Sequence, residues 1–284
     1  DALDRDVAVQ SLARAYWTEE DIRSRFLREA RALARVNHPH VVQVFDVGEA
    51  NGGPFFVMEL VSGQNVSTLL SERGVMDEGR ALRLARQAVL GLQAAALAGV
   101  VHRDVKPANL MVSPQVGGDL VKVTDFGLAF PTADAAARMT SASVILGTPE
   151  YMAPEQARGQ AVDERADQYA LGCTLYEMLT GRVPFTGPTP QAVLGLHLSS
   201  VPEPPRTHRP DLTGPVQQLI LRLMSREPQN RYASWAEVVQ AIDSVLSGMP
   251  VPGPAPTLNI SGGTASAPAL PPVPQVSGST TRVE

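Results

Sequence analysis

The sequence predicts an α+β fold in two lobes, with a small strand-rich lobe at residues 1–62 and a larger helical lobe at residues 63–246. Short stretches of alternating apolar and polar residues gather in the first part, with one helical pattern between them. The second part carries long helical periodicity and a single hairpin pattern. A cleft between two such lobes is where we expect a ligand to bind.

The composition is that of a globular chain with a linker at its end. Hydrophobic residues make up 44% and charged residues 19% of the 284 residues, which is the ordinary balance of a folded domain. Residues 247–284 are mainly Pro, Gly, Ser, Thr and Val, without a helical or strand period. Such a segment cannot bury enough apolar surface to offset its ordering entropy, so we expect a disordered linker there.

The charge and the cysteine count restrict the partners and the compartment. A net charge of −5 gives no reason to expect nucleic acid as a partner. Cys173 is the only cysteine, which excludes an intramolecular disulfide and suggests reducing, cytoplasmic surroundings. We expect it to be a buried thiol, because it lies in the apolar stretch 169–179. The sequence has no run of 18 apolar residues, so we expect no membrane span within it.

Three strands are expected in the first part. Residues 6–12 alternate, with Val7 and Val9 on one face. Residues 41–47 and 55–61 are two further β-rich stretches, joined across an Asn-Gly-Gly turn.

A helix is expected between the first two strands. Thr18 is the expected N-cap, followed by acidic residues that favour the positive end of the helix dipole. Ile22, Phe26 and Leu33 then fall on one stripe at helical spacing. Glu29 lies on the same stripe, and an inward carboxylate is costly unless something pairs with it.

The second part is expected to be helical around one hairpin. Asp77 is the expected cap of a long helix that ends at Gly99. A hairpin is expected between residues 110–112 and 120–124, across a Gly-Gly-Asp turn. From there on, residues 154–246 show a helical pattern interrupted by Pro-rich turns.

Two short motifs carry the chemistry. Residues 102–109 read H-R-D-V-K-P-A-N directly after a helix end, and residues 125–127 read D-F-G directly after the hairpin. In this order, with Asn109 and Asp125 standing 16 positions apart, they resemble the catalytic core of protein kinases. Each residue alone is open to a structural interpretation, as a turn residue, a strand cap or a solvated charge. The joint occurrence favours the functional interpretation.

The resemblance extends over nearly the whole chain. Residues 147–155 read G-T-P-E-Y-M-A-P-E and look like the substrate-docking loop, and residues 167–172 resemble the start of the buried central helix. Residues 58–61 resemble the hinge that binds adenine, and Arg231 matches the arginine that pairs with Glu155. The Lys-Pro pair in the first motif is typical of the Ser/Thr-directed subclass. The chain is similar to bacterial Hanks-type Ser/Thr protein kinase domains, truncated at its N-terminus.

The resemblance implies transfer of the ATP γ-phosphate to Ser or Thr hydroxyls of protein substrates, with ATP and Mg²⁺ bound. It implies Asp104 as the base, Lys106 as the cation at the transferred phosphate, and Asn109 and Asp125 as Mg²⁺ ligands. His102 is expected to be structural, packing below Phe126. The nucleotide site that the resemblance implies is lined by Ala8, Gln10, Glu29, Met58, Glu59, Val61 and Met111.

Regulatory residues are implied as well. Arg103 matches the arginine that grips a phosphate on the activation loop, which here would cover residues 128–153. Our hypothesis is that Thr140 is the switch phosphosite, with Thr148 a second regulatory threonine. A polar loop without modification stays open as the alternative. Dimerisation for autophosphorylation is a further expectation.

The resemblance breaks at Gln10, where active kinases carry a lysine that pairs with the helix glutamate and with the ATP phosphates. The spacing of 19 positions from Gln10 to Glu29 fits the family, so the register is right. Gln10 can donate a hydrogen bond to Glu29 but cannot neutralise a phosphate. We therefore expect a loss of ~3 kcal/mol of transition-state stabilisation. The chain has two lysines, Lys106 and Lys122, and neither comes from the first lobe. Glu29 is therefore expected to lack its cation.

The Gly-rich loop and its two strands are also absent from the sequence, and we expect them to precede Asp1 in the parent gene. Their absence would expose a sheet edge. Two function classes stay open, an active or weakly active Ser/Thr kinase and a pseudokinase that acts as a nucleotide-sensing or scaffolding module. The kinase is favoured because Gln10 is the one visible catalytic substitution. A small-molecule kinase is less favoured, because the docking loop suits peptides.

The pattern looks most like the bacterial membrane-anchored branch of the family. The resemblance implies a cytoplasmic domain whose full-length parent is anchored at the inner face of the cell membrane. Such an anchor would lie outside this chain.

Overall fold

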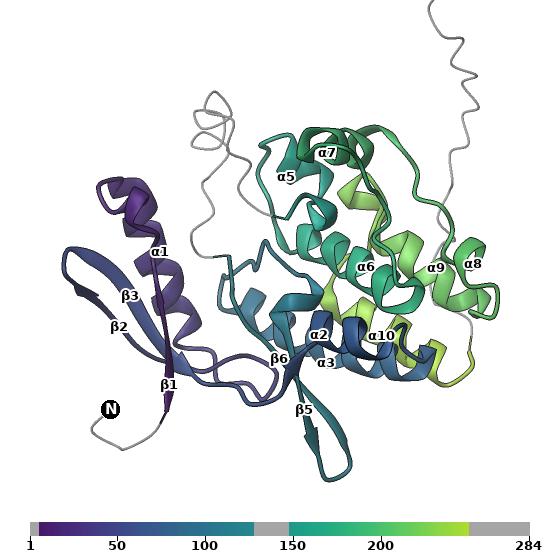
Figure 1. Ribbon diagram of the computed structural model, residues 1–284, viewed down its shortest axis with the longest axis horizontal. Coiled ribbons are helices and arrows are strands. Elements are labelled where there is room, and N and C mark those ends of the chain that lie inside the picture. Colours follow the sequence, from purple (N-terminus) through teal and green to yellow (C-terminus); the bar gives the residue numbers. More distant parts are fainter. Residues whose placement is uncertain (1–5, 128–147, 250–284) are drawn as a thin grey trace, which may run out of the picture.

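The small lobe is a three-stranded antiparallel sheet covered by one long helix. In the computed structural model, which describes residues 6–127 and 148–249, the sheet has the strand order β1-β3-β2. Figure 1 shows helix α1 beside this sheet, apart from the helical lobe. The elements of the small lobe are β1 (Val7–Ser11), α1 (Glu20–Leu33), β2 (Val44–Ala50) and β3 (Gly53–Glu59), with a short 3-10 turn at Arg14–Tyr16.

Helix α1 packs on the sheet through the apolar stripe that the sequence predicts. The ring of Phe26 lies against the ring of Phe56 on β3, with centroids 5.6 Å apart. The predicted cap is wrong, since Glu19 and not Thr18 occupies the N-cap position, with no side-chain capping bond. Strand β1 pairs only with β3 among the described strands, so its other edge is open.

Two predicted strands are displaced along the chain. Strand β2 begins at Val44, because the backbone just before it is bonded to the other lobe: Val42 N donates to Val123 O at 3.0 Å, and Val123 N donates to His40 O at 2.9 Å. Strand β3 begins at Gly53 and ends at Glu59, because its first residues continue the pairing from the turn. The two backbone bonds of Val123, to Val42 and His40, connect the two lobes directly.

The large lobe is helical and contains a second small sheet of order β4-β5-β6. Helix α3 begins and ends as predicted. Asp77 accepts a hydrogen bond from Arg80 N at 3.0 Å, and Gly99 follows the helix with φ 78°. The hairpin is longer than predicted, with a turn at Val116–Gly117. The elements are β4 (Gln64–Asn65), α2 (Val66–Arg73), α3 (Glu78–Leu97), β5 (Leu110–Gln115), β6 (Gly118–Val123), α5 (Pro154–Ala157), α6 (Glu164–Thr180), α7 (Pro190–Ser199), α8 (Pro205–His208), α9 (Gly214–Leu223) and α10 (Trp235–Leu246).

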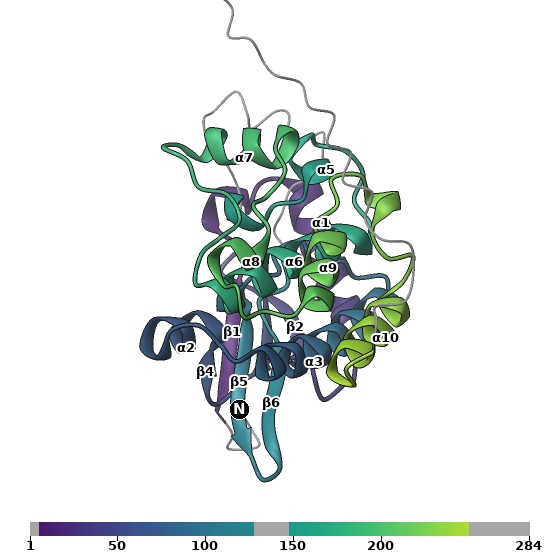
Figure 2. The ribbon, with the colours of Figure 1, turned by 90° about the vertical axis from the view of Figure 1, so that its right-hand side faces the viewer.

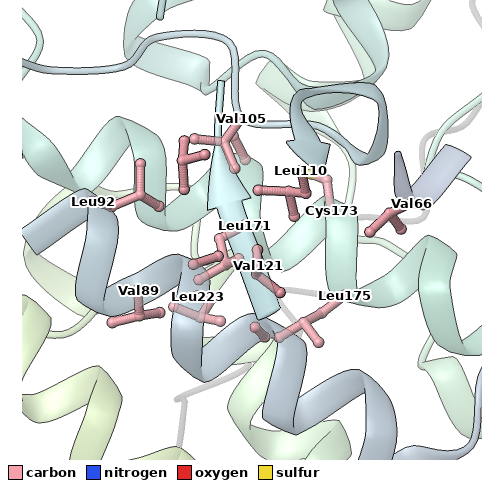
Figure 3. Packing of buried hydrophobic residues seen from close by; sticks show 14 of the residues in the cluster. Val66, Val89, Leu92, Val105, Leu110, Val121, Leu171, Cys173, Leu175 and Leu223 are labelled. Carbon is pink, nitrogen blue, oxygen red and sulfur yellow. The ribbon is translucent and has the colours of Figure 1, made fainter. Parts of the chain in front are cut away.

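Helix α6 is the centre of the large lobe. It packs against α3 and α9, and α10 lies against α3 on the outside (Figure 2). Figure 3 shows Leu171, Cys173 and Leu175 of this helix among Val89 of α3 and Leu223 of α9. Cys173 is fully buried, as predicted, and burial raises the pKa of its thiol.

The two-lobed α+β fold is therefore confirmed. Among the described residues, no helix combines the length and the apolar character that a bilayer crossing requires. The predicted linker lies outside the described residues from position 250 onward.

Candidate functional site

The loop between α3 and β5 brings three predicted catalytic side chains together. Lys106 Nζ lies 2.7 Å from Asp104 Oδ2 and donates a hydrogen bond to Thr148 Oγ1 at 2.6 Å. Asn109 Nδ2 donates to the backbone oxygen of Asp104 at 2.8 Å and to its Oδ2 at 3.1 Å. Asp104 is thus held by a cation and an amide, in a conformation that the loop itself fixes.

The orientation of Asn109 suits a cation ligand. Both side-chain hydrogen bonds that this buried residue makes among the described residues use Nδ2, which leaves its side-chain carbonyl oxygen available. The short 3-10 turn Pro107–Asn109 and the bond from Thr124 N to Asn109 O at 3.0 Å fix its backbone. Amide and carboxylate oxygens are the ligands that Mg²⁺ prefers.

Asp125 stands at the end of β6 in an unusual backbone conformation, with φ 51°. Non-glycine residues rarely adopt positive φ, and such residues gather at functional sites. Burial raises the pKa of the Asp125 carboxyl group, and the Thr124 hydroxyl lies 3.5 Å from its Oδ2. A bound cation would offset this burial penalty, so the residue fits a metal ligand.

Asp167 at the start of α6, for which the sequence predicted no role, fixes the catalytic loop. Its Oδ2 accepts a hydrogen bond from His102 N at 2.8 Å, and its Oδ1 accepts one from Arg103 N at 2.7 Å. Complete burial raises the pKa of Asp167 to about 7 although both backbone donors favour the charged form. The signal in the sequence is an acidic residue two positions before the apolar stretch 169–179.

His102 is structural, as predicted. Its ring lies 4.4 Å from the ring of Phe126, measured between centroids. Its Nδ1 accepts a hydrogen bond from Asp104 N at 3.2 Å, which places the proton on Nε2, opposite Thr124 O at 2.9 Å. Burial lowers the pKa of His102 to about 4, so the ring is neutral at physiological pH.

The residues expected to line the nucleotide lie on both sides of the lobe junction. Ala8 on β1 is paired in register with Met58 on β3, and Met111 on β5 with Lys122 on β6. Glu59, at the end of β3, accepts a hydrogen bond from Lys122 Nζ at 2.7 Å. Lys122 is therefore engaged at the hinge. Val61 follows in the connection to the large lobe, half-buried.

The expectation for Glu29 is wrong, because this carboxylate has a cation. Arg103 Nη1 donates to Glu29 Oε1 at 3.0 Å and to Oε2 at 3.1 Å, across the two lobes. No hydrogen bond joins Gln10 to Glu29 among the described residues, and the buried Oε1 of Gln10 has no partner there. Arg103 of the catalytic loop is therefore the partner of Glu29 that Gln10 on β1 was expected to be.

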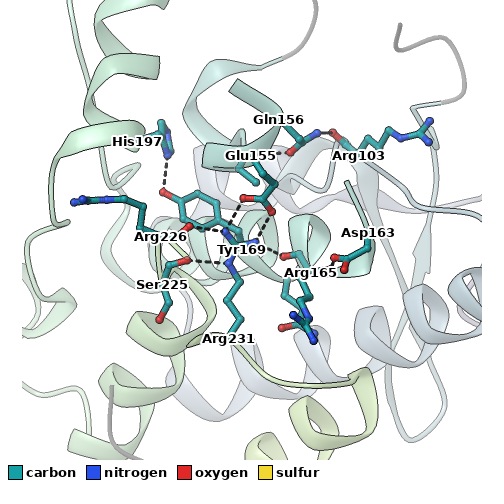
Figure 4. A network of polar contacts seen from close by, with 12 residues as sticks. Arg103, Glu155, Gln156, Asp163, Arg165, Tyr169, His197, Ser225, Arg226 and Arg231 are labelled. Carbon is teal, nitrogen blue, oxygen red and sulfur yellow. Dashed lines mark hydrogen bonds and ion pairs between the residues drawn. The ribbon is translucent and has the colours of Figure 1, made fainter. Parts of the chain in front are cut away.

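The remaining predicted residues fall into two groups. Arg231 Nη1 and Nη2 donate to the two carboxylate oxygens of Glu155 at 2.6 and 2.8 Å, in the polar network of Figure 4. Thr148 lies beside Lys106, at the entrance of the 3-10 turn Pro149–Tyr151. Thr140 lies outside the described residues.

Comparison with known proteins finds serine/threonine-protein kinases that are similar to this chain. The chain is 41% identical over 251 residues to the serine/threonine-protein kinase pkn3 of Myxococcus xanthus, covering 85% of this chain and 46% of that protein. It is 39% identical over 256 residues to the serine/threonine-protein kinase PknB of Mycobacterium tuberculosis (strain ATCC 25618 / H37Rv), covering 89% of this chain and 40% of that protein. The chain thus spans less than half the length of these curated relatives.

The solved structures add the fold. The crystal structure of the PknI kinase domain of Mycobacterium tuberculosis superposes with a TM-score of 0.66 at 29% identity, covering 84% of this chain and 85% of that one. Residues 4–242 match the protein kinase domain family. The chain therefore belongs to the protein kinase domain family.

Proposed function

We propose that this chain is the catalytic domain of a Ser/Thr protein kinase, which transfers the γ-phosphate of ATP to hydroxyl groups of protein substrates. The observation that carries the proposal is the bonded set of Asp104, Lys106 and Asn109 on a loop fixed by Asp167. Relatives at about 40% identity carry the name serine/threonine-protein kinase. The set supplies positioning and charge, which are what phosphoryl transfer requires.

Asp104 accepts the proton of the substrate hydroxyl as its oxygen forms a bond to the γ-phosphorus and the bond from that phosphorus to the ADP oxygen breaks. Lys106 lies 2.7 Å from Asp104 Oδ2, so its ammonium group is close to the attacked phosphoryl group and can balance its negative charge. Thr148 holds the other side of that ammonium group.

Protein kinases use ATP with Mg²⁺. Asn109 and Asp125 would hold the metal ion, because one offers an amide oxygen without a hydrogen bond among the described residues and the other a carboxylate whose pKa burial raises. When bound, Mg²⁺ neutralises charge on the phosphates. Ala8, Met58 and Met111 would form the apolar surface for the adenine ring.

The proposal includes regulation through the activation loop. Arg103 would bind a phosphate on Thr140 through the guanidinium nitrogens that it does not use for Glu29, and Thr148 would act through its bond to Lys106. Protein substrates that carry Ser or Thr, dimerisation for autophosphorylation, and a cytoplasmic location with an anchor outside this chain complete the proposal.

The test is transfer of labelled γ-phosphate from Mg-ATP to the protein itself and to a generic basic substrate. We expect the unsubstituted protein to transfer phosphate and the Asp125→Ala variant to have lost this transfer. Mass spectrometry of the labelled protein then tests Thr140, and phosphate elsewhere in the loop with none on Thr140 would contradict that assignment. Absence of transfer in the parent, with tight Mg-ATP binding, would favour the pseudokinase alternative that the neutral Gln10 raises.

A further inference from the structure

Glu29 determines where α1 can lie, because it is a buried carboxylate on the face that packs inward. Its side chain is 11% exposed, and both of its oxygens are bonded to Arg103 Nη1. A buried charge that loses its partner is strongly destabilising. The cation that neutralises Glu29 therefore fixes the position of the helix.

Among the described residues, Arg103 is the cation outside α1 that is bonded to Glu29. Both lysines of the chain are engaged elsewhere, Lys106 with Asp104 and Lys122 with Glu59. Arg25 interacts electrostatically with Glu29, but it stands one turn away on the same helix. A residue of α1 itself cannot hold α1 against the rest of the protein.

The arginine is itself held rigidly. Its backbone adopts φ 66°, its N donates to Asp167 Oδ1 at 2.7 Å, and its O accepts from Gln156 Nε2 at 3.1 Å. Figure 4 shows the contact with Gln156 at the edge of the polar network. The guanidinium group is thus attached to a fixed point of the catalytic loop, one residue before Asp104.

We propose that Arg103 is a positioning residue in this chain, which takes over from the lysine missing at position 10 the task of holding Glu29 and α1. The helix is then placed relative to the catalytic loop and not relative to β1. The catalytic consequence rests on the proposed kinase function, whereas the structural consequence does not. Gln10 is left as a neutral residue whose buried carbonyl oxygen has no partner among the described residues.

The experiment measures the distance between α1 and the large lobe with two spin labels on the full chain. The labels are attached at Arg31→Cys on α1 and Arg83→Cys on α3, two exposed positions, while the native Cys173 is buried. We expect Glu29→Gln and Arg103→Gln each to broaden or shift the distance distribution. The double variant should add nothing, because both changes break the same contact.

Two variants make the test specific. Arg23→Gln is the matched control, since Arg23 joins α1 to Glu49 of the same lobe and its loss should leave the distance unchanged. In the Gln10→Lys background the introduced lysine can hold Glu29, so Arg103→Gln should no longer alter the distance. An unchanged distribution in both single variants, or a persistent Arg103→Gln effect in the Gln10→Lys background, would overturn the proposal.

Activity gives the second readout. If the parent transfers phosphate, we expect Glu29→Gln to lower kcat roughly tenfold with little change in the KM for ATP. An unchanged kcat beside a shifted distance would overturn the catalytic part. If the parent transfers no phosphate, the proposed function fails, and the spin-label distances still decide whether Arg103 holds α1.

Discussion

Two buried Arg–Glu pairs show how differently the two lobes are constructed. Arg231 and Glu155 lie inside the helical lobe, joined by two parallel bonds, with side chains 0% and 6% exposed. Arg103 and Glu29 join the lobes through one nitrogen, with side chains 20% and 11% exposed. The first pair uses the full bidentate geometry of arginine, and the second does not.

The surroundings of the two pairs extend the contrast. Arg231 also donates to the backbone oxygens of Ser225, Arg165 and Arg226, at 2.8, 2.7 and 3.2 Å (Figure 4). No comparable set of backbone acceptors surrounds the Arg103 guanidinium group among the described residues. The helical lobe thus holds its part of the site by itself, whereas the small lobe depends on the helical lobe for the cation of its buried glutamate.

The largest effect is expected from breaking the Arg231–Glu155 pair inside the helical lobe. Arg231→Met leaves Glu155 buried without its cation, which should cost about 3–5 kcal/mol of unfolding free energy. Urea unfolding at neutral pH measures it. Arg86→Gln, which removes a partly exposed pair with Asp243, is the control and should cost less than about 1 kcal/mol. Similar losses in the two variants would show that burial does not distinguish the pairs.

The next effect concerns the small lobe. Gln10→Lys supplies the phosphate cation that the sequence lacks, and should raise kcat/KM by a factor on the order of 10² to 10³. Gln10→Met, which has similar size and no charge, should give no gain. The measurement is the ATP dependence of phosphate transfer. Equal rates for the parent and the Gln10→Lys variant would mean that the chain does not depend on a cation at this position.

A third prediction concerns His197, which lies beside the Arg231–Glu155 network, and tests its contribution to stability as a function of pH. His197 Nδ1 lies 2.7 Å from the hydroxyl of Tyr169, whose ring also contacts Arg231. Burial lowers the pKa of His197 to about 4 from the 6.5 of an unfolded chain. The unfolded state then binds more protons between these values, so this contribution to stability is complete above pH 6.5 and is lost as the pH falls toward 4.

The loss should reach about 3 kcal/mol at pH 4. We expect the unfolding free energy of the parent to fall relative to that of His197→Asn as the pH is lowered from 7 to 4. The comparison with the variant cancels the contributions of the other titrating groups, including Asp167, whose raised pKa acts in the opposite direction. Parallel pH curves for the two proteins would contradict the lowered pKa of His197.

The parts that sequence reasoning predicted are those whose contacts are local. Helix α3 carries its own cap and stop signals in Asp77 and Gly99, and both act as expected. Asp104, Lys106 and Asn109 bond to one another within a few residues of chain. Their geometry therefore follows from the motif itself.

The parts that it missed depend on contacts between distant segments. Strand β2 starts late because Val42 bonds to Val123 in the other lobe. Glu29 lies 74 positions from Arg103, and a motif that assigns each residue a single partner cannot show that they meet once the usual lysine is missing. The same holds for Asp167, whose acceptor role appears only when α6 and the catalytic loop are placed together.

The smallest effect is expected at the N-terminal caps of the two long helices, α1 in the small lobe and α3 in the large lobe. Asp77 caps α3 through Arg80 N, whereas α1 begins at Glu19 with no side-chain cap. Asp77→Ala should therefore cost about 1 kcal/mol of unfolding free energy, since an N-terminal backbone donor loses its acceptor. Glu19→Ser supplies a cap residue to α1 and should raise stability by a few tenths to about 1 kcal/mol, measured by urea unfolding. A stabilised Glu19→Ser protein would show that the start of α1 has room for improvement, which α3 lacks. A destabilised one would mean that the Glu19 side chain has a role of its own at this position.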